Sequence, residues 1–464
     1  MTAFLYFAAG AALIFSARRV SPISWRAGIA LLLLPLSLTG GALLRGRVYG
    51  PVDLAYTAEP LASMAGPAGV SAVANPLASD AFSQFMPWSA AVRFALSHHQ
   101  WPLWNPFELG GGPLAGAVQA APYHPVHLVA CLLPLPGSFG FNAAMFSLLA
   151  ALSMFLFLRE LAVAELAALF GAAAWMLSVD LVSFAGTAHG AAMSTLPFAL
   201  FGAQRIAHRP GAGSMALLTL ALSLTILAGH PESVLHVVAL ASFWFAWELF
   251  GGGISAEQRK RRMLRSVLCG FGAGALSLLL CAFFLLPMVE AIPQTRELSH
   301  RRQQPIAQRV PIREAVHRMA LGLVPYLDGE AGVERAVHPE RDGHGQLGSA
   351  YVGTLALGMT AFVLLQFRDR RVRVLAGLAV FGILAGASAP GLTQLLGRAP
   401  VFSIAVNDRM ISYAALALAA MAGIALDTAI RKSFRGTAPV LLAAALGFGL
   451  LAATRSGDLS ASFL

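Results

Sequence analysis

Apolar runs of roughly 17–25 residues recur along the whole chain, and they restrict its fold more than any other feature. A helix of this length crosses a bilayer core of about 30 Å. Because lipid offers no hydrogen-bond partners, each run must satisfy its own backbone groups, as a helix does. We predict about twelve spans, over residues 2–17, 27–44, 139–158, 162–179, 187–203, 213–229, 233–250, 266–288, 349–366, 374–389, 410–427 and 437–453.

The composition agrees with an all-α polytopic membrane protein. Hydrophobic residues make up 57% of the 464 residues and charged residues only 12%, whereas soluble domains carry about 25% charged residues. A net charge of +10 would suggest nucleic acid in a soluble protein, but these cations lie in short loops, so we expect no nucleic-acid partner. The three cysteines lack metal-ligand or redox spacing and are interpreted as small core residues.

The charges of the loops alternate along the chain. Short basic loops all fall on one side of the predicted bundle, which the positive-inside rule assigns to the cytoplasm. Their cations are Arg18, Arg19, Arg26, Arg159, Arg205, Arg209, Arg259, Lys260, Arg261, Arg262, Arg265, Arg368, Arg370, Arg371, Arg373, Arg431, Lys432 and Arg435. The long segments, about 45–138, 289–348 and 390–409, are then outside. We therefore expect one transmembrane domain over 1–453 and an outer tail, 454–464, whose abrupt end suggests truncation.

The first outer segment has the most polar and aromatic character. Residues 80–99 place apolar side chains at helical spacing but are too short and polar to span, which predicts an amphipathic interfacial helix. Ser79 or Asp80 could cap its start. Trp101, Trp104 and Tyr123 suit the headgroup layer. In the second outer segment a helix is expected over about 311–322.

The order of residues in this segment resembles that of the YfhO-like bacterial membrane proteins. The matching positions are Asp53, Asn75-Pro76, Ser79-Asp80, Gln84, Pro87-Trp88, Arg93, the Pro102–Pro106 run, Gly112–Leu114, Gln119 and Pro125. Weaker matches follow in order, at Ala228–Glu232, Gly348–Gly353 and Arg409. The chain departs from the family in its shorter length and in an extra span before the first outer loop.

The resemblance implies a function in the GT-C glycosyltransferase superfamily. Such enzymes take a sugar from a polyprenyl-phosphate carrier and transfer it to an acceptor, with a catalytic acid in the first large outer loop. We therefore expect a GT-C-like fold in the bacterial cytoplasmic membrane, with its active site facing the periplasm or the outside. Its partners would be membrane lipid, a polyprenyl-phosphate-linked sugar and a cell-surface glycan or lipid acceptor.

Two acids are candidates for the general base that takes the proton of the acceptor hydroxyl. Asp80 is the first choice, near a helix start where an ionised acid is favoured, although a helix cap needs the same residue. Asp53 follows a span and is the rival, with a solvated loop acid as the alternative. Gln84 lies one helical turn after Asp80, so it could orient the acid or bind sugar.

The remaining candidates would bind the carrier or the sugar. Arg409, at the outer start of a span, is the predicted ligand of the carrier phosphate, although Asp408 could simply neutralise it. The other candidates are Arg93, Trp104, Asn105, His189, His230, Glu232 and Tyr351; lipid contact or a satisfied interfacial hydrogen bond is the alternative for several. No metal ligand or cofactor is predicted, and a divalent metal is left open, because a single close histidine at His230-Pro-Glu232 is weak for zinc.

Two other functions are compatible with such a chain. A flippase or transporter of lipid-linked sugars would carry ionisable residues at mid-membrane and inverted repeats. A non-catalytic scaffold for envelope assembly would tolerate changes at Asp80.

Overall fold

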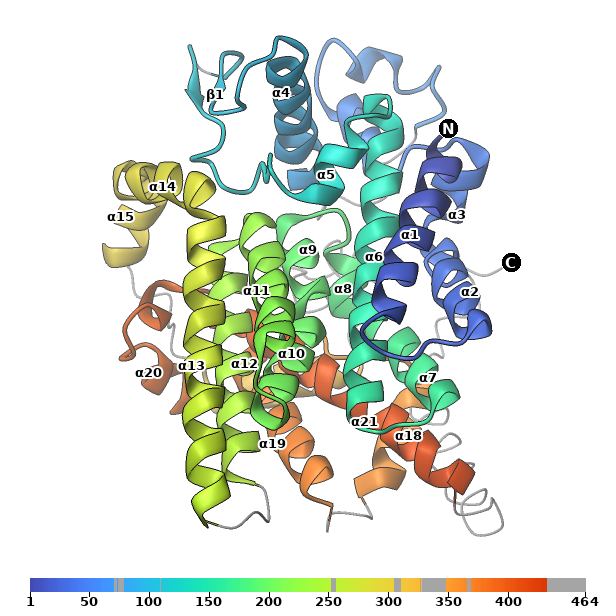
Figure 1. The fold of residues 1–464 in the computed structure, drawn as a ribbon. Coiled ribbons are helices and arrows are strands. Elements are labelled where there is room, and N and C mark those ends of the chain that lie inside the picture. The colour runs from blue at the N-terminus through green and yellow to red at the C-terminus, as the bar shows by residue number, and fades with distance from the viewer. Residues whose placement is uncertain are drawn as a thin grey trace. The chain divides into compact units, whose positions relative to one another are not determined.

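The computed structural model describes residues 1–70, 73, 79–108, 110–251, 256–303, 310–325, 327, 348–364 and 369–431. Within these ranges the protein is almost entirely helical, and the one sheet described is a hairpin that pairs β1, Trp104–Asn105, with β2, Gly112–Pro113. The predicted all-α class is therefore confirmed for this part of the chain (Figure 1).

Four helices in the described ranges are long and apolar enough to cross a membrane. They are α6 (Leu135–Glu160), α12 (Pro231–Phe250), the Lys260–Leu280 part of α13 (Ala256–Leu280), and Asn407–Arg431. A fifth span results if α2 (Trp25–Leu33) and α3 (Leu36–Arg45), which meet at 70°, count as one. Twelve spans remain a prediction, and the range 437–453 lies outside the described residues.

Several predicted spans are broken, among them 187–203, which divides at Thr195 between α9 (Ala188–Ser194) and α10 (Leu196–His208). Residues 27–44 divide at Pro35, between α2 and α3, as expected where proline cannot continue the backbone hydrogen bonds. Residues 266–288 divide at Cys281, where α13 ends and α14 (Ala282–Ala291) begins. Hydropathy alone concealed the breaks at Thr195 and Cys281, whereas Pro35 is a helix breaker that the sequence does show.

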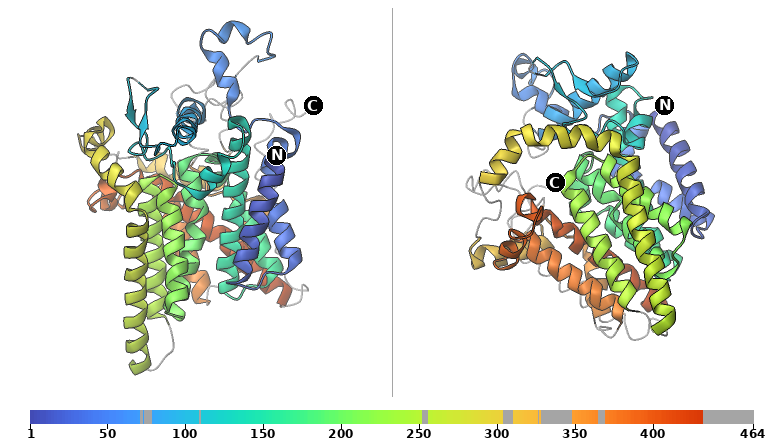
Figure 2. Two further views of the ribbon diagram at one scale, coloured as in Figure 1. Left: turned by 45° about the horizontal axis from the view of Figure 1, so that its top comes forward. Right: turned by 60° about the vertical axis from the view of Figure 1, so that its left-hand side comes forward.

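The chain divides into two compact units, and the first comprises Met1–Val20, Gly28–Leu149 and Phe184–His300. Its centre is formed by α10 (Leu196–His208), α11 (Ala212–Leu227), α12 and α13, which pack against one another (Figure 2). Gly202 of α10 permits a close approach, because a Cβ there would lie 2.9 Å from the Leu218 Cα of α11. The unit also contains α1 (Thr2–Arg18), α3 and α9 (Ala188–Ser194).

The second unit comprises Ser21–Ala27, Ala150–Ser183 and Arg301–Leu464, as far as these are described. Its central helix is α21 (Ile411–Arg431), which packs against α7 (Glu165–Met176), α18 (Thr354–Leu364) and α19 (Arg370–Gly386). All of the first fifteen residues of α21 are buried, and many are alanines. Small side chains let the neighbouring helices approach closely, as is common in membrane bundles.

The predicted outer segment, which lies in the first unit, forms short elements. Chain order gives η1 (Val52–Thr57), η2 (Ala62–Met64), η4 (Ala81–Phe85), α4 (Met86–Ser97), the β1–β2 hairpin and α5 (Pro125–Ala130). Residues 79–97 are continuously helical, which confirms the predicted helix over 80–99. The remaining described elements are α8 (Val179–Ser183), η5 (Ile292–Gln294), α15 (Arg296–Gln303), α16 (Ile312–Leu323), α20 (Leu392–Leu396), η6 (Phe402–Ile404) and η7 (Asn407–Met410).

The basic loops predicted to share one side do gather within each unit. In the first unit the Arg205 guanidinium donates to the Val20 carbonyl, and that of Arg262 donates to the Ala207 carbonyl. In the second unit Arg371 donates to Leu161 O, and Arg431 to Ala162 O. These contacts agree with the predicted alternation of the loops, while the assignment of that side to the cytoplasm stays a prediction.

Candidate functional site

The predicted base, Asp80, lies at an exposed helix start in the first unit and accepts a hydrogen bond from Gln84. The Nε2 of Gln84 is 3.1 Å from Asp80 Oδ1, so the two residues share one face as predicted. Asp80 lies in the first turn of a helix that is continuous from residue 79, and its side chain makes no cap hydrogen bond to η4. The η4 turn is π-helical, a rare form that is frequent at functional sites.

Asp53, the rival base, is carried by an element that contacts η4. The half-buried Asp53 lies in η1, which packs against η4. The approach is close just before η1, because a Cβ on Gly50 would lie 2.9 Å from the Met86 Cε. The structure thus brings the elements of both candidate acids together, and it does not choose between the two residues.

The Arg93 guanidinium donates hydrogen bonds to backbone carbonyls of the same unit. Its Nη2 donates to Ala130 O at 2.7 Å, and its Nη1 contacts the carbonyls of Cys131 and Leu133. These three carbonyls lie at and just beyond the end of α5, where helix carbonyls lose their regular partners, although Ala130 O also accepts from Leu133 N at 3.0 Å. These contacts give Arg93 a positioning role in the outer segment, whereas phosphate binding by Arg93 stays untested.

Trp104 and Asn105 form the first strand of the hairpin. Asn105 is buried: its Nδ2 donates to Glu108 Oε2 at 3.1 Å and its Oδ1 accepts from Phe107 N at 3.1 Å. Trp104 is 57% exposed and its ring lies against Gly111, where a Cβ would come within 2.6 Å of the indole nitrogen. Asn105 therefore shapes the turn, and Trp104 is the member of this pair that could meet a ligand.

His189 and His230 are joined by a serine that the sequence analysis missed. Ser233 Oγ lies 2.9 Å from His189 Nδ1 and 2.8 Å from His230 Nδ1, and all three residues are buried. His230 Nδ1 also accepts the backbone N–H of Ser233, which indicates a lone pair on that nitrogen. The serine hydroxyl then donates to His230 and accepts from His189, which makes a directed hydrogen-bond chain.

The position of Ser233 could have been inferred. His230 is the N-cap residue of α12, and Ser233 follows it by three residues. The side chain of an N-cap residue commonly accepts the backbone N–H of the third residue after it. Glu232, also predicted, lies in the same first turn and is half-buried. The His189–Ser233–His230 chain and Glu232 thus gather at one end of α9 and α12 in the first unit.

The second unit contains Tyr351 and Arg409, together with a buried acid that the sequence analysis also missed. Asp180 is 1% exposed, and its Oδ2 accepts from Ser412 Oγ at 2.8 Å. Ser412 Oγ also lies 3.0 Å from the Arg409 carbonyl, and Tyr351 O accepts from Val179 N at 2.9 Å. The signal that could have indicated Asp180 is an ionisable residue beside a predicted apolar span.

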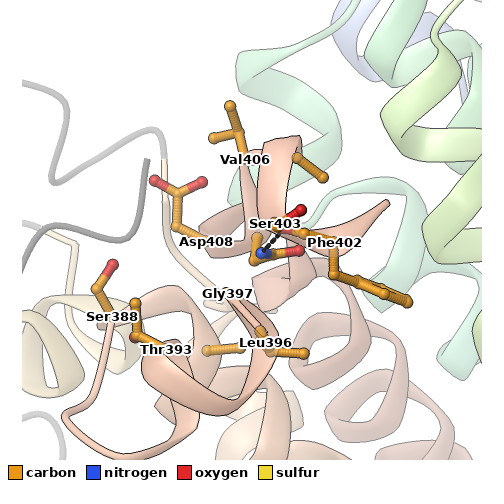
Figure 3. Close-up of a pocket in the computed structure, with 11 residues that line it drawn as sticks. Ser388, Thr393, Leu396, Gly397, Phe402, Ser403, Val406 and Asp408 are labelled. Atoms are coloured by element: carbon orange, nitrogen blue, oxygen red, sulfur yellow. Dashed lines mark hydrogen bonds between the residues drawn. The ribbon is translucent and has the colours of Figure 1, made fainter. Parts of the chain in front are cut away.

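A small cavity of about 50 Å³ lies in the second unit beside η7 (Figure 3). Its polar lining includes Asp408 and Asn407, whose Nδ2 donates to Phe402 O at 2.8 Å. It is lined by Ala385, Ser388, Thr393, Leu396, Gly397, Phe402, Ser403, Ala405, Val406, Asn407 and Asp408. A space of this size holds a few waters.

His124 and His127, which are not among the predicted site residues, have lowered pKa values. Burial and the neighbouring His127 hold the pKa of His124 well below its ordinary value of 6.5. Burial also lowers the pKa of His127, although its hydrogen bond to Ala121 O opposes the shift. Both rings pack against Phe146 of α6. The pair is therefore neutral near pH 7 and sits in the outer segment of the first unit.

Among the described residues no group of three or more His, Cys, Asp or Glu side chains could hold a metal ion. No protein-family model matches the chain, and no curated protein shows significant similarity to it. The functional assignment therefore depends on the resemblance noted in the sequence and on the geometry described above.

Proposed function

We propose that the protein is a GT-C-type glycosyltransferase of the bacterial cytoplasmic membrane. It transfers a sugar from a polyprenyl-phosphate carrier to a cell-envelope acceptor on the outer face. The observation that carries the proposal is the Asp80–Gln84 pair, an accessible carboxylate held by an amide on an outer-segment helix. An accessible acid in a membrane protein with few charged residues suits proton transfer better than packing.

The proposed reaction is a single inverting displacement. The acceptor hydroxyl oxygen attacks the anomeric carbon as the bond from that carbon to the carrier phosphate oxygen breaks. Asp80, or Asp53 on the adjoining η1, takes the hydroxyl proton, and the polyprenyl phosphate leaves with the bond's electron pair. A guanidinium matches phosphate geometry and would neutralise the charge of the leaving group.

The test is replacement of the two acids in cells that lack the chromosomal copy of the gene. Asp80→Asn, Asp53→Asn and the double variant are compared by glycosylation of the surface polymer. Loss of a general base costs about 10²–10⁴-fold in rate, so one single variant and the double variant should fail to glycosylate. Glu314→Gln, an exposed acid paired with Arg318, is the control. Full activity in both single variants and the double variant would remove the proposed base.

A transporter of lipid-linked sugars is the second candidate, and the buried polar groups favour it. Asp180 at the start of α8 and the His189–Ser233–His230 chain at the starts of α9 and α12 are buried, and ionisable residues buried in a membrane protein commonly mark proton or substrate pathways. Purified protein in vesicles would then move a fluorescent lipid-linked sugar across the bilayer without an acceptor. Translocation with no sugar transfer would favour this function over the transferase.

A further inference from the structure

One face of α14 is apolar and exposed. Phe283, Leu286 and Val289 follow one another at intervals of three residues and are 47%, 68% and 61% exposed. This spacing places them on one side of the helix. Three large apolar side chains on one helix face exceed the scattered exposure that is normal on a surface.

The opposite face of α14 is fixed to the rest of the first unit. Phe284 is buried and Met288 packs with it in a cluster that includes Ala115 and Tyr123. The helix and the outer segment meet closely, because a Cβ on Gly116 would lie 2.9 Å from the Ala291 Cβ. The exposed face therefore points outward because the helix is held in one rotation.

The position of α14 follows from α13. The Lys260–Leu280 span is 21 residues long, about 30 Å at the helical rise, which equals the thickness of the bilayer core. Its end is therefore at the membrane boundary. There α14 begins after Cys281 and turns away from the axis of α13 (Figures 1 and 2).

The exposed surface of α13 continues into the exposed face of α14. Only 17% of the α13 span is buried, and Leu268, Phe271 and Leu279 are among its exposed side chains. In a membrane protein such a surface faces lipid. The apolar face of α14 extends it at the level where the bilayer core ends, which suits the acyl boundary.

The next helix supplies positive charge. α15 carries three arginines against one glutamate, and Arg296 and Arg302 are exposed. Arginines at a membrane surface are attracted to the phosphates of anionic lipids. We propose that α14 and α15 bind the bilayer surface, with the apolar face of α14 in the acyl boundary and the α15 arginines on anionic phospholipid headgroups. This inference does not rest on the transferase proposal.

Nitroxide depth measurements on the full chain in phospholipid nanodiscs test the α14 part. A label at Leu286→Cys should be relaxed by oxygen more than by a water-soluble nickel chelate. A label at Ser63→Cys, an exposed position in η2, is the control and should show the reverse. The labelled wild-type chain gives the background from its native cysteines. Nickel access at position 286, or shielding there from both reagents by a second copy or another protein, would overturn the proposal.

Lipid binding tests the α15 part. Native mass spectrometry of the purified chain should show preferential retention of phosphatidylglycerol over phosphatidylcholine. Arg296→Gln and Arg302→Gln should each weaken that retention about fivefold, whereas Arg318→Gln on α16 should not change it. Unchanged phosphatidylglycerol binding in the double variant would overturn the proposal. So would a loss confined to polyprenyl phosphate, because the site would then belong to the carrier.

Discussion

The surroundings of the two acids Asp80 and Asp180 suit them to different tasks. Asp80 is exposed and receives one amide hydrogen bond, so a substrate can reach it. Asp180 is buried and accepts a hydrogen bond from the hydroxyl of Ser412. Ser412 follows Arg409 by three residues. We interpret Asp180 as a positioning residue that helps to hold the η7 turn and its arginine.

The Asp180–Ser412 hydrogen bond leads to a stability prediction. Ser412→Ala removes the hydroxyl and leaves the buried Asp180 Oδ2 without that donor, which should lower the free energy of unfolding by about 1–3 kcal/mol. Thermal unfolding of the detergent-purified chain measures the change. Ser16→Ala on α1, where the hydroxyl is exposed, is the control and should have almost no effect. Equal stability of Ser412→Ala and wild type would contradict the contribution of this bond.

Protonation of His124 and His127 leads to a pH prediction. Because burial lowers both pKa values below 6.5, the unfolded chain takes up protons at a higher pH than the folded chain. Their contribution to stability is fully present above pH 6.5 and is lost as the pH falls from 6.5 through the folded-state pKa values. The melting temperature, measured between pH 8 and pH 5, should therefore decrease once the pH is lower than 6.5. His124→Phe should reduce that slope, and an unchanged slope would contradict the assignment.

Close helix contacts set the packing at the scale of the elements. In the second unit α19 meets α21 at Gly382, where a Cβ would lie 2.6 Å from Ala414 N. Gly382→Val should therefore separate the two helices and lower the melting temperature by several degrees, corresponding to about 1–3 kcal/mol. Gly377→Ala, on the same helix with open space beside it, is the matched control and should unfold as wild type. Similar melting of both variants would show that α19 and α21 do not pack closely there.

Element positions were more predictable from the sequence than element contacts. Periodicity predicted helices over 80–99 and 311–322, and the structure has helices at 79–97 and Ile312–Leu323. The contacts of Arg93 could not be predicted, because its carbonyl partners are 37–40 residues away. The contact of Ser233 with His189 could not be predicted either, because the two residues are 44 positions apart, and only the place of Ser233 in the first turn of α12 could be inferred.

The whole molecule combines many apolar helices with polar residues gathered in particular segments. Charge alternation in the loops predicted which segments lie together, and the contacts of Arg205 and Arg371 agree with it. Hydropathy could not locate the break at Cys281, because both sides of it are apolar. It also could not reveal that Asp180 is buried, since burial depends on helices far away in sequence.

The orientation of the molecule is testable with impermeant thiol reagents on intact cells. Cysteine at Ser63, in the predicted outer segment, should react from outside, whereas cysteine at Ala256, which begins α13 just before the basic residues 259–265, should react only after permeabilisation. Labelling followed by mass spectrometry measures both. The opposite pattern would place the candidate acids in the cytoplasm and exclude transfer on the outer face.

The most direct test of the central claim is release of polyprenyl phosphate by the purified chain in nanodiscs. The substrates are a panel of polyprenyl-phosphate-linked sugars with cell-envelope acceptors. Wild-type protein should release carrier phosphate only when an acceptor is present, and replacement of the base, Asp80→Asn or Asp53→Asn, should slow release by at least about 100-fold. Glu314→Gln should react at the wild-type rate. Release that is equally fast in wild type, both single variants and the double variant would contradict catalysis by these acids.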